Sequence, residues 1–281
     1  GHCVHPLDCE RWRTGCGQCP DLRRNYTVWS DRTALVWKAK RRAFQRAPIT
    51  LVVSSQWMRE RVAASPLLSH LPCHVIPFGL DLETWRPQDR PACRARLGIP
   101  PEAKVVAFRM PTREKHRVAK GVPWLVEALH RLPPDIATHL LVFDARGQLG
   151  ELTDRYRILE LGWVEDGRRM AEALTAADVF VTPSLAESFG MMALEAMACG
   201  TAVVASEGTA MTETIRPPRA GLCVAPRDAG ALAQALAALL ADDARREAMG
   251  TAGRDLVESE YSYATYLDRH LRLYEALAGQ S

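Results

Sequence analysis

The feature that most constrains this chain is a regular alternation of short apolar runs and helical runs between residues 102 and 260. Runs such as KVVAFRM (104–110) and DVFVTPS (178–184) have the length and composition of strands, and segments with helical spacing follow them. Strands that alternate with helices are typical of a parallel sheet with helices on both faces. Residues 102–260 are therefore predicted to form one doubly wound, Rossmann-like α/β domain.

Three further segments flank this domain along the chain. Residues 1–78 hold further strand and helix patterns but are too short to close such a sheet, so we expect a partial N-terminal Rossmann-like domain that continues upstream, with a Cys-rich loop at 1–22. Residues 79–101 begin as a polar, Pro-rich stretch and are predicted to link the domains. Residues 261–281 form a helix with an aromatic stripe, expected to pack back on the N-terminal domain. Ser55 is expected to cap the helix that follows it.

Composition and charge narrow the functional class. No apolar run approaches about 18 residues, so no membrane-spanning helix is predicted. Single, scattered cysteines without a secretion signal indicate reduced thiols and a cytoplasmic protein.

The net charge is +3, but the first 61 residues hold twelve basic and five acidic side chains. This bias favours an anionic partner, such as a phosphate-bearing acceptor or the inner face of the cell membrane, or else reflects a solvated basic helix around Lys38–Arg46.

The loop LAESFG (185–190) follows a predicted strand and precedes an apolar helix. Ligands of open parallel sheets bind beyond the carboxyl ends of the strands, where this loop would lie. Ser188 is expected to be the N-cap of the helix, and Gly190 allows a ligand to approach the backbone. The free amides of Phe189 to Met192, together with the helix dipole, are expected to attract phosphate.

Two acids, Glu187 and Glu195, flank this helix start. A rise of about 1.5 Å per residue places them ~10 Å apart, too far to share one bond-breaking step. They suit the two ends of an extended ligand such as a sugar–diphosphate–ribose. The spacing of the acids by itself also arises by chance, and a Glu in a first helical turn is favourable for the dipole alone. The specific signal is the combination of strand, Pro-Ser, Glu, Phe-Gly, second Glu and Cys-Gly.

That combination resembles the signature of retaining glycosyltransferases of family 4, which have the two-domain GT-B fold. The resemblance extends over nearly the whole chain, and Phe78 stands where Asn is common in the interdomain pattern. The Cys-rich start resembles an insert in one branch of these enzymes, many of which act in polysaccharide synthesis. The segments that carry the resemblance are PSLAESFGMMALEAMACGTAVVAS, HVIPFGLDLETWRP, KGVPWLVEAL, GTAMTETI, GLCVAPRDAGALAQAL and GHCVHPLDCERWRTGCGQCPDL.

The resemblance implies roles for individual residues. Glu187 would bind hydroxyls of the donor sugar near the reacting centre, and Glu195 would hold the ribose. Lys120 would neutralise the departing diphosphate, with an arginine as its partner. The Gly-Arg usual in the family is absent, and of the candidates Arg109, Arg113 and Arg117 the last is chosen because it is nearest the loop end. The resemblance implies further contacts to the donor from Ser188, Phe189, Gly190, Met191, Met192 and Glu213.

The chemistry implied is transfer of a hexosyl-type sugar from a nucleotide-diphosphate sugar to a glycan, lipid-linked or polysaccharide-precursor acceptor, with retention of configuration. Retention through a protein nucleophile needs two carboxyl groups ~5 Å apart, so a same-face displacement assisted by the leaving phosphate is expected. No cofactor is then required for catalysis, and no Asp-x-Asp metal sequence occurs in the chain.

Four cysteines crowd the first twenty residues: Cys3, Cys9, Cys16 and Cys19. The Cys16–Cys19 spacing suits half of a structural zinc site, and His2 or His5 can substitute for one of the looser cysteines. Reduced thiols in a Gly-rich loop, or disulfides in an oxidising setting, are the alternatives.

Two other functions compete with the glycosyltransferase. A catalytically incomplete chain that only binds a nucleotide sugar is favoured by the expected missing N-terminal region and by the absent Gly-Arg. A zinc-dependent nucleic-acid binder would use the cysteines and basic residues of the first 61 positions, but it leaves the alternating strands and helices unexplained, and no nucleic-acid partner is expected.

Overall fold

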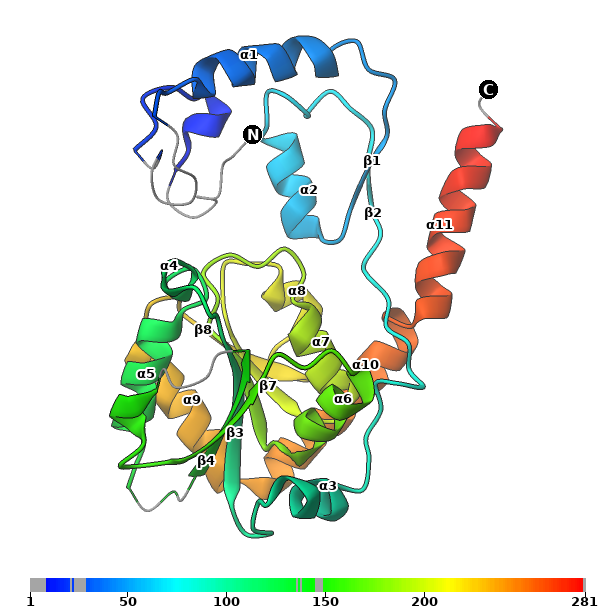
Figure 1. Ribbon diagram of the computed structural model, residues 1–281. Helices are drawn as coiled ribbons and strands as arrows, with labels where there is room; N and C mark the ends of the chain where they lie inside the picture. Colours follow the sequence, from blue (N-terminus) through cyan, green and yellow to red (C-terminus); the bar gives the residue numbers. More distant parts are fainter. Residues whose placement is uncertain are drawn as a thin grey trace. The chain divides into compact units, whose positions relative to one another are not determined.

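The computed structural model describes residues 9–20, 22, 29–134, 136, 138–144 and 149–279. The chain divides into two compact units, 1–77 and 78–281. Figure 1 labels most of the helices and strands of the two units.

The first unit holds a two-stranded parallel sheet in which Leu51 of β1 pairs with Cys73 of β2. Ser55 caps α2, because its side chain accepts a hydrogen bond of 3.2 Å from the amide of Met58, and this prediction is confirmed. The basic helix α1 has no buried residue. The elements of this unit are η1 (Arg11–Arg13), α1 (Thr33–Phe44), β1 (Leu51–Val53), α2 (Gln56–Ala63) and β2 (Cys73–Val75).

The second unit contains a six-stranded sheet in the order β5-β4-β3-β6-β7-β8, with every pair parallel. The predicted doubly wound α/β fold is therefore confirmed. The strands are β3 (Lys104–Met110), β4 (Thr138–Asp144), β5 (Arg157–Gly162), β6 (Val179–Thr182), β7 (Ala202–Ser206) and β8 (Gly221–Val224). The helices are α3 (Arg90–Leu97), α4 (Glu114–Arg117), α5 (Val122–Arg131), η2 (Gly150–Leu152), α6 (Gly167–Ala176), α7 (Met191–Ala198), α8 (Met211–Ile215), α9 (Ala229–Ala241), α10 (Asp243–Glu260) and α11 (Tyr263–Ala278).

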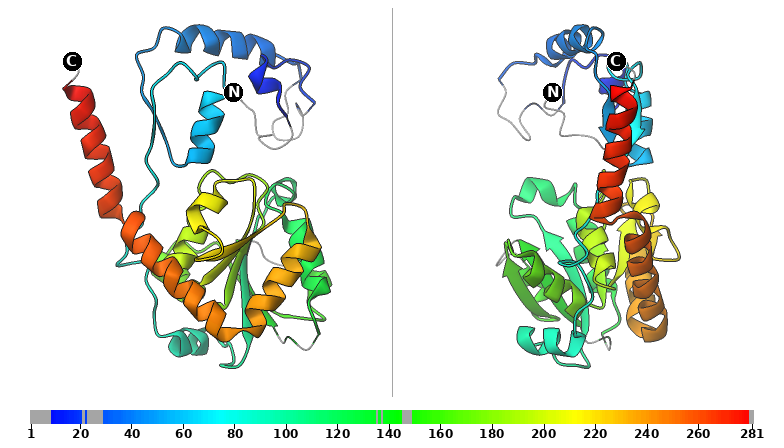
Figure 2. Two further views of the ribbon diagram at one scale, coloured as in Figure 1. Left: turned by 180° about the vertical axis from the view of Figure 1, so that it is seen from behind. Right: turned by 90° about the vertical axis from the view of Figure 1, so that its right-hand side faces the viewer.

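Both faces of this sheet are buried, which is why its strands read as nearly continuous apolar runs. Along β3, Val105 and Ala107 belong to one core cluster, whereas Val106 and Phe108 belong to the other. Helices α5 and α9 cover one face, and α6, α7 and α10 cover the other (Figure 1). Figure 2 shows from behind how α9 and α10 run on to one another through the turn at Asp242.

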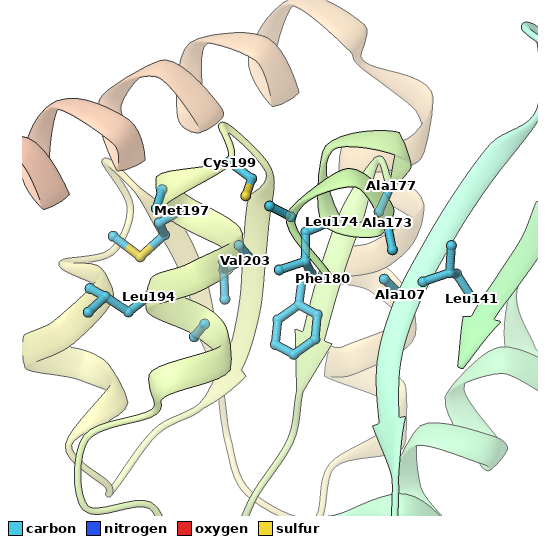
Figure 3. Packing of buried hydrophobic residues seen from close by; sticks show 14 of the residues in the cluster. Ala107, Leu141, Ala173, Leu174, Ala177, Phe180, Leu194, Met197, Cys199 and Val203 are labelled. Atoms are coloured by element: carbon cyan, nitrogen blue, oxygen red, sulfur yellow. The ribbon is translucent and has the colours of Figure 1, made fainter. Parts of the chain in front are cut away.

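Figure 3 shows the second of these faces at close range, where side chains of the strands meet α6 and α7. Phe180 of β6 is only 1% exposed and lies at the centre of this packing. Burial of a side chain of this size contributes about 1.5–3 kcal/mol, so the cluster fixes α7 on the sheet. The labelled members are Ala107, Leu141, Ala173, Leu174, Ala177, Phe180, Leu194, Met197, Cys199 and Val203.

Two peripheral segments belong to this unit. Within 79–101, α3 packs against α6, and its Cys93 is fully buried in the core. In α11, Leu273 is buried, whereas Tyr263, Leu271 and Tyr274 are more than half exposed. Packing of the α11 stripe on the N-terminal domain stays a prediction.

Candidate functional site

A pocket of about 180 Å³ lies at the carboxyl ends of β3 and β6. These neighbours are the point where the strand order reverses, since β4 and β5 extend the sheet on one side and β7 and β8 on the other. Open α/β sheets bind their ligands in the crevice at such a switch point. The described residues that line it are Phe78, Arg109, Lys120, Leu125, Phe180, Val181, Thr182, Pro183, Ser184, Glu187, Ser188, Phe189, Gly190, Met191, Met192 and Ala193.

The start of α7 forms one wall of this pocket. The N-cap is Gly190, with φ of +90°, and not Ser188 as predicted. The chain takes the left-handed conformation at Gly190, where a Cβ would lie 2.2 Å from Met211 Sδ, so only glycine fits this turn. The first helical hydrogen bond runs from the Leu194 amide to the Gly190 carbonyl, and the amides of residues 191–193 precede it.

Two loops approach each other closely beside the pocket. The Leu185 amide donates to the Ala119 carbonyl at 2.9 Å, which ties the loop after β6 to the loop after β3. At Gly121, which has φ of +74°, a Cβ would lie 1.9 Å from the carbonyl oxygen of Pro183. The sequence therefore needs glycine at 121 to bring the neighbouring lysine to the pocket.

Lys120 and Glu187 meet at this point. Lys120 Nζ donates to Glu187 Oε2 at 2.8 Å, and the side chains are 40% and 20% exposed. The two predicted catalytic residues, 67 positions apart in the chain, therefore lie together in the pocket lining.

Arg109 is the arginine that lines the pocket, and Arg117 is not among the described lining residues. Arg109 forms an ion pair with Asp144, and its guanidinium carbon lies 5.7 Å from the ring centre of Trp163. The sequence did contain a signal for Arg109, because it is a charged residue between the apolar Phe108 and Met110 at the carboxyl end of the predicted strand KVVAFRM.

Glu195 is half-buried on α7 and does not line this pocket. Burial raises the pKa of its carboxyl group to about 7, and the charge of Arg109 opposes this shift. Glu195 and Arg109 are thus electrostatic neighbours beside the pocket.

Five other residues that were predicted to contact the donor lie in the pocket lining. Ser188, Gly190, Met191 and Met192 line the pocket. Phe189 does too, but it is 3% exposed and its ring packs edge-on against Phe78 and Tyr261.

Glu213 lies in α8 and does not line this pocket. Its predicted contact with a donor stays a prediction.

The cysteine loop has its own hydrogen bonds. The Cys19 amide donates to Asp31 Oδ2 at 2.7 Å, and the Gly17 amide donates to Thr33 Oγ1 at 2.9 Å. Among the residues that the structure describes, no three His, Cys, Asp or Glu side chains form a group able to hold a metal ion.

Cys3 lies outside the described residues, together with His2 and His5. The zinc site of Cys3, Cys9, Cys16 and Cys19 therefore stays a prediction. Elemental analysis of the intact purified chain tests it: about one zinc per chain is expected, and less than about a tenth of an equivalent would contradict it.

The pocket is suited to an anion flanked by hydroxyl groups. Its described lining carries two cations, Arg109 and Lys120, and one carboxylate, Glu187. The start of α7 adds backbone donors and the positive end of the helix dipole. A phosphate fits the cations and the helix start, and the carboxylate accepts hydrogen bonds from hydroxyl groups.

The described part of the chain contains no helix that is both long and apolar enough to cross a membrane.

Comparisons with known proteins agree with the fold. The family model described as glycosyl transferases group 1 matches residues 110–242. The α-maltose-1-phosphate synthase of Mycobacterium tuberculosis is 33% identical over 272 residues, an alignment that covers 88% of this chain and 66% of that protein. The phosphatidyl-myo-inositol mannosyltransferase of the same species is 36% identical over 217 residues, covering 73% and 54%. The chain thus spans about two thirds or less of the length of these relatives.

Among solved structures, a sucrose-phosphate synthase from Thermosynechococcus elongatus superimposes with a TM-score of 0.76 at 28% identity. The match covers 92% of this chain and 66% of that one. With the switch-point pocket, the family match and these relatives in agreement, the chain belongs to the group 1 glycosyl transferases, the family 4 enzymes with the GT-B fold.

Proposed function

We propose that this chain carries the donor-binding part of a retaining glycosyltransferase, which moves a hexosyl sugar from a nucleotide-diphosphate sugar to an acceptor. The observation that carries the proposal is the pocket in which Lys120, Glu187 and the start of α7 converge at the switch point of the sheet. The relatives' names support it, since one is a mannosyltransferase and the other synthesises a sugar phosphate.

In this proposal the diphosphate binds between the α7 amides and two cations, Lys120 and Arg109. Arg109 replaces Arg117 as the partner of Lys120, because Arg109 lines the pocket. Preorganised positive charge of this kind stabilises a departing diphosphate more than the bound donor, since negative charge develops as the bond breaks.

Glu187 would accept hydrogen bonds from the hydroxyl groups of the donor sugar. Its neighbour Lys120 would hold the carboxylate in place through their ion pair and would contact the diphosphate on its other side. Glu195 would bind the ribose, because it lies on the same helix and beside Arg109.

The reaction proposed is a displacement on one face of the sugar. The bond from the anomeric carbon to the phosphate oxygen breaks, and the bond to the acceptor oxygen forms on the same face. The acceptor's proton passes to the departing phosphate oxygen, so atoms and charge balance without a protein nucleophile. Glu187 is the one carboxylate in the described lining, which agrees with this route over one that needs two close carboxyl groups. A covalent glycosyl–Glu187 adduct detected by mass spectrometry would contradict it.

The acceptor proposed is phosphate-bearing or lipid-linked, a class that includes polysaccharide precursors at the inner face of the cell membrane. The basic first 61 residues favour an anion. The two relatives' names each include a phosphate group, in maltose 1-phosphate and in phosphatidyl-myo-inositol.

A second candidate, a chain that binds the nucleotide sugar without catalysis, is favoured by one observation. The alignment covers 66% of the α-maltose-1-phosphate synthase, so about a third of that relative has no counterpart in the aligned residues. Binding and transfer must therefore be tested separately.

The test of donor binding is calorimetric titration of the 281-residue chain with UDP-, GDP- and ADP-glucose and the corresponding mannose donors. Tight binding of one nucleotide series is expected, with loss in Glu195→Ala. Equal affinity for all three nucleotides, or no binding of any, would contradict the proposal. Release of free sugar or its transfer to a phosphate-bearing acceptor then separates the enzyme from the binding fragment.

A further inference from the structure

Phe78 brings an exposed aromatic ring into the lining of the switch-point pocket. It is the first residue of the second unit, and 43% of its surface is exposed. The two other aromatic residues of the described lining, Phe180 and Phe189, are only 1% and 3% exposed. Phe78 is therefore the one ring in that lining that a ligand can cover to a large extent.

The backbone that carries Phe78 is fixed on the start of α11. The Leu80 amide donates to the Tyr261 carbonyl at 2.8 Å, and the Tyr263 amide donates to the Leu80 carbonyl at 2.8 Å. At Gly79 a Cβ would lie 2.7 Å from Cβ of Tyr266, so glycine is needed for this close approach. The ring is thus carried on a segment that is held in place before any ligand arrives.

Two buried rings support Phe78. Its ring centre lies 5.3 Å from that of Phe189 with the planes at 88°, and Phe189 packs in the same edge-to-face manner against Tyr261 at 5.7 Å. Tyr261 is buried in the core. Edge-to-face pairs are favourable beyond the area that they bury, so this row of rings anchors Phe78 while part of its ring stays exposed.

The same segment of chain positions Glu187. The Glu187 carbonyl accepts from the Ala210 amide at 3.1 Å, and the Phe189 carbonyl accepts from Thr214 Oγ1 at 2.8 Å. Thr214 is completely buried. The pocket therefore combines a carboxylate and an exposed ring that are both held by the surrounding structure.

A pyranose sugar matches this combination because it has two kinds of surface. Its hydroxyl groups project around the rim, whereas its C–H groups make parts of its faces apolar. The carboxylate of Glu187 can accept hydrogen bonds from the hydroxyl groups. Covering C–H groups with the Phe78 ring removes apolar surface from water, a gain that a phosphate group does not offer.

We propose that an apolar face of the donor's hexosyl group packs on the ring of Phe78, while Glu187 binds hydroxyl groups at the rim of the same sugar. This inference rests on the proposed nucleotide-sugar function. It adds the side chain that distinguishes the sugar-bearing donor from the free nucleoside diphosphate. The cations Lys120 and Arg109 serve the diphosphate, which both ligands share.

The test compares calorimetric dissociation constants of variants of the full chain. Phe78→Ala removes the ring, Phe78→Leu keeps an apolar side chain without a ring, and Phe78→Tyr keeps the ring. Tyr274→Ala is the matched control, because Tyr274 is an exposed aromatic residue of the same unit that does not line the pocket. Circular dichroism verifies that each variant is folded.

The probes are the glucose and mannose donors of UDP, GDP and ADP, each compared with its free nucleoside diphosphate. Covering about 30–60 Å² of apolar surface corresponds to roughly 3- to 13-fold in affinity. Phe78→Ala is expected to weaken binding of the sugar-bearing donor by this factor and to leave free nucleoside diphosphate binding within about twofold. Phe78→Leu should lie between Phe78→Ala and the wild type, and both Phe78→Tyr and Tyr274→Ala should match the wild type.

Different outcomes would overturn the inference in distinguishable ways. Unchanged donor affinity in Phe78→Ala would do so and leave the proposed function intact. An equal loss for the free nucleoside diphosphate would show that Phe78 maintains the shape of the pocket and does not contact the sugar. If Phe78→Ala does not fold, wild-type donor affinity in Phe78→Leu would refute a role for the ring. A wild-type chain that binds no sugar-bearing donor and no nucleoside diphosphate would overturn the inference and the proposed function together.

Discussion

Lys120 Nζ lies 2.8 Å from Glu187 Oε2, so each group partly neutralises the other in the absence of a ligand. The lysine comes from the loop after β3, and the carboxylate comes from the loop after β6. A bound diphosphate would share the lysine with the carboxylate, and the hydroxyl groups of a sugar would occupy the remaining lone pairs of Glu187. The pair thus places a cation for phosphate and an acceptor for hydroxyl groups side by side.

The first prediction concerns Lys120. Lys120→Ala is expected to weaken nucleoside diphosphate binding by about 10- to 100-fold, the loss of one charge-assisted contact. The free energy of unfolding should change by less than about 1 kcal/mol, because the ion pair is partly exposed. Titration calorimetry and urea denaturation measure the two effects.

Lys104→Ala is the matched control. Lys104 also pairs with an acid, Asp243, at 2.5 Å, but it lies at the amino end of β3. Its substitution should leave the dissociation constant unchanged. Equal affinities of wild type and Lys120→Ala would refute a phosphate-binding role for the lysine.

The second prediction concerns Gly121. Gly121→Ala is expected to lower the free energy of unfolding by about 2–4 kcal/mol, since a Cβ would overlap the Pro183 carbonyl and the φ of +74° disfavours alanine. The two loops must then separate, so nucleotide affinity should fall as well. Gly98→Ala shares a positive φ of +68° but has no neighbour within 4 Å, and it should cost only about 1 kcal/mol with unchanged affinity. If the two variants are equally stable, the loops are not in close contact.

The third prediction concerns pH and Glu195. Its pKa is about 7 in the folded protein against an ordinary value of 4.5, so the folded state binds the extra proton. At 1.36 kcal/mol per pKa unit, this shift contributes on the order of 3 kcal/mol to the free energy of unfolding. The contribution is fully present below pH 4.5 and is lost as the pH rises through 7. Urea denaturation at pH 5 and pH 8 measures it.

Glu195→Gln provides the comparison, because the amide cannot ionise. The loss of stability between pH 5 and pH 8 should be smaller in Glu195→Gln than in the wild type by about the same amount. Parallel pH profiles for the two proteins would show that the carboxyl group is ionised in the folded state at neutral pH.

The fourth prediction concerns Asp178, which is 3% exposed at the amino end of β6. Its carboxylate pairs with Arg90 at 2.6 Å, Arg94 at 2.8 Å and Arg246 at 3.0 Å, and it accepts from the Val105 amide. Asp178→Asn would remove the counter-charge of the buried Arg94 guanidinium, whereas Arg246 would keep its pair with Asp243. Removing one partner of a buried ion pair costs about 3–5 kcal/mol. Nucleotide affinity should persist at temperatures where the variant is folded, because the cluster lies at the end of the sheet opposite the pocket.

The control for this variant is Asp268→Asn. Asp268 pairs with Arg272 at 2.9 Å, but the two side chains are 54% and 76% exposed. Its loss should change the free energy of unfolding by less than about 1 kcal/mol. A comparable loss for both variants would mean that burial does not distinguish the two pairs.

Several residues show why the site could be only partly predicted from the sequence. The Glu187 loop and the glycine at 190 were identifiable, because strand, turn and helix signals are local. The N-cap was misassigned to Ser188, because capping propensity depends on residue type alone. It does not include the tertiary contact by which Met211 Sδ lies so close to residue 190 that a Cβ there would clash. Among the candidate arginines, distance along the chain favoured Arg117, whereas the pocket lining contains Arg109.

The sequence by itself determined the order and type of the elements, because helical and strand periodicities depend on neighbours within a few positions. It also placed the loop after β6 at the ligand-binding end of a parallel sheet. Only the tertiary structure decided which distant side chains meet: Lys120 with Glu187, and Arg109 with Trp163. The physical reason is that these contacts depend on strand order, register and the close approach of loops, which no short-range pattern encodes.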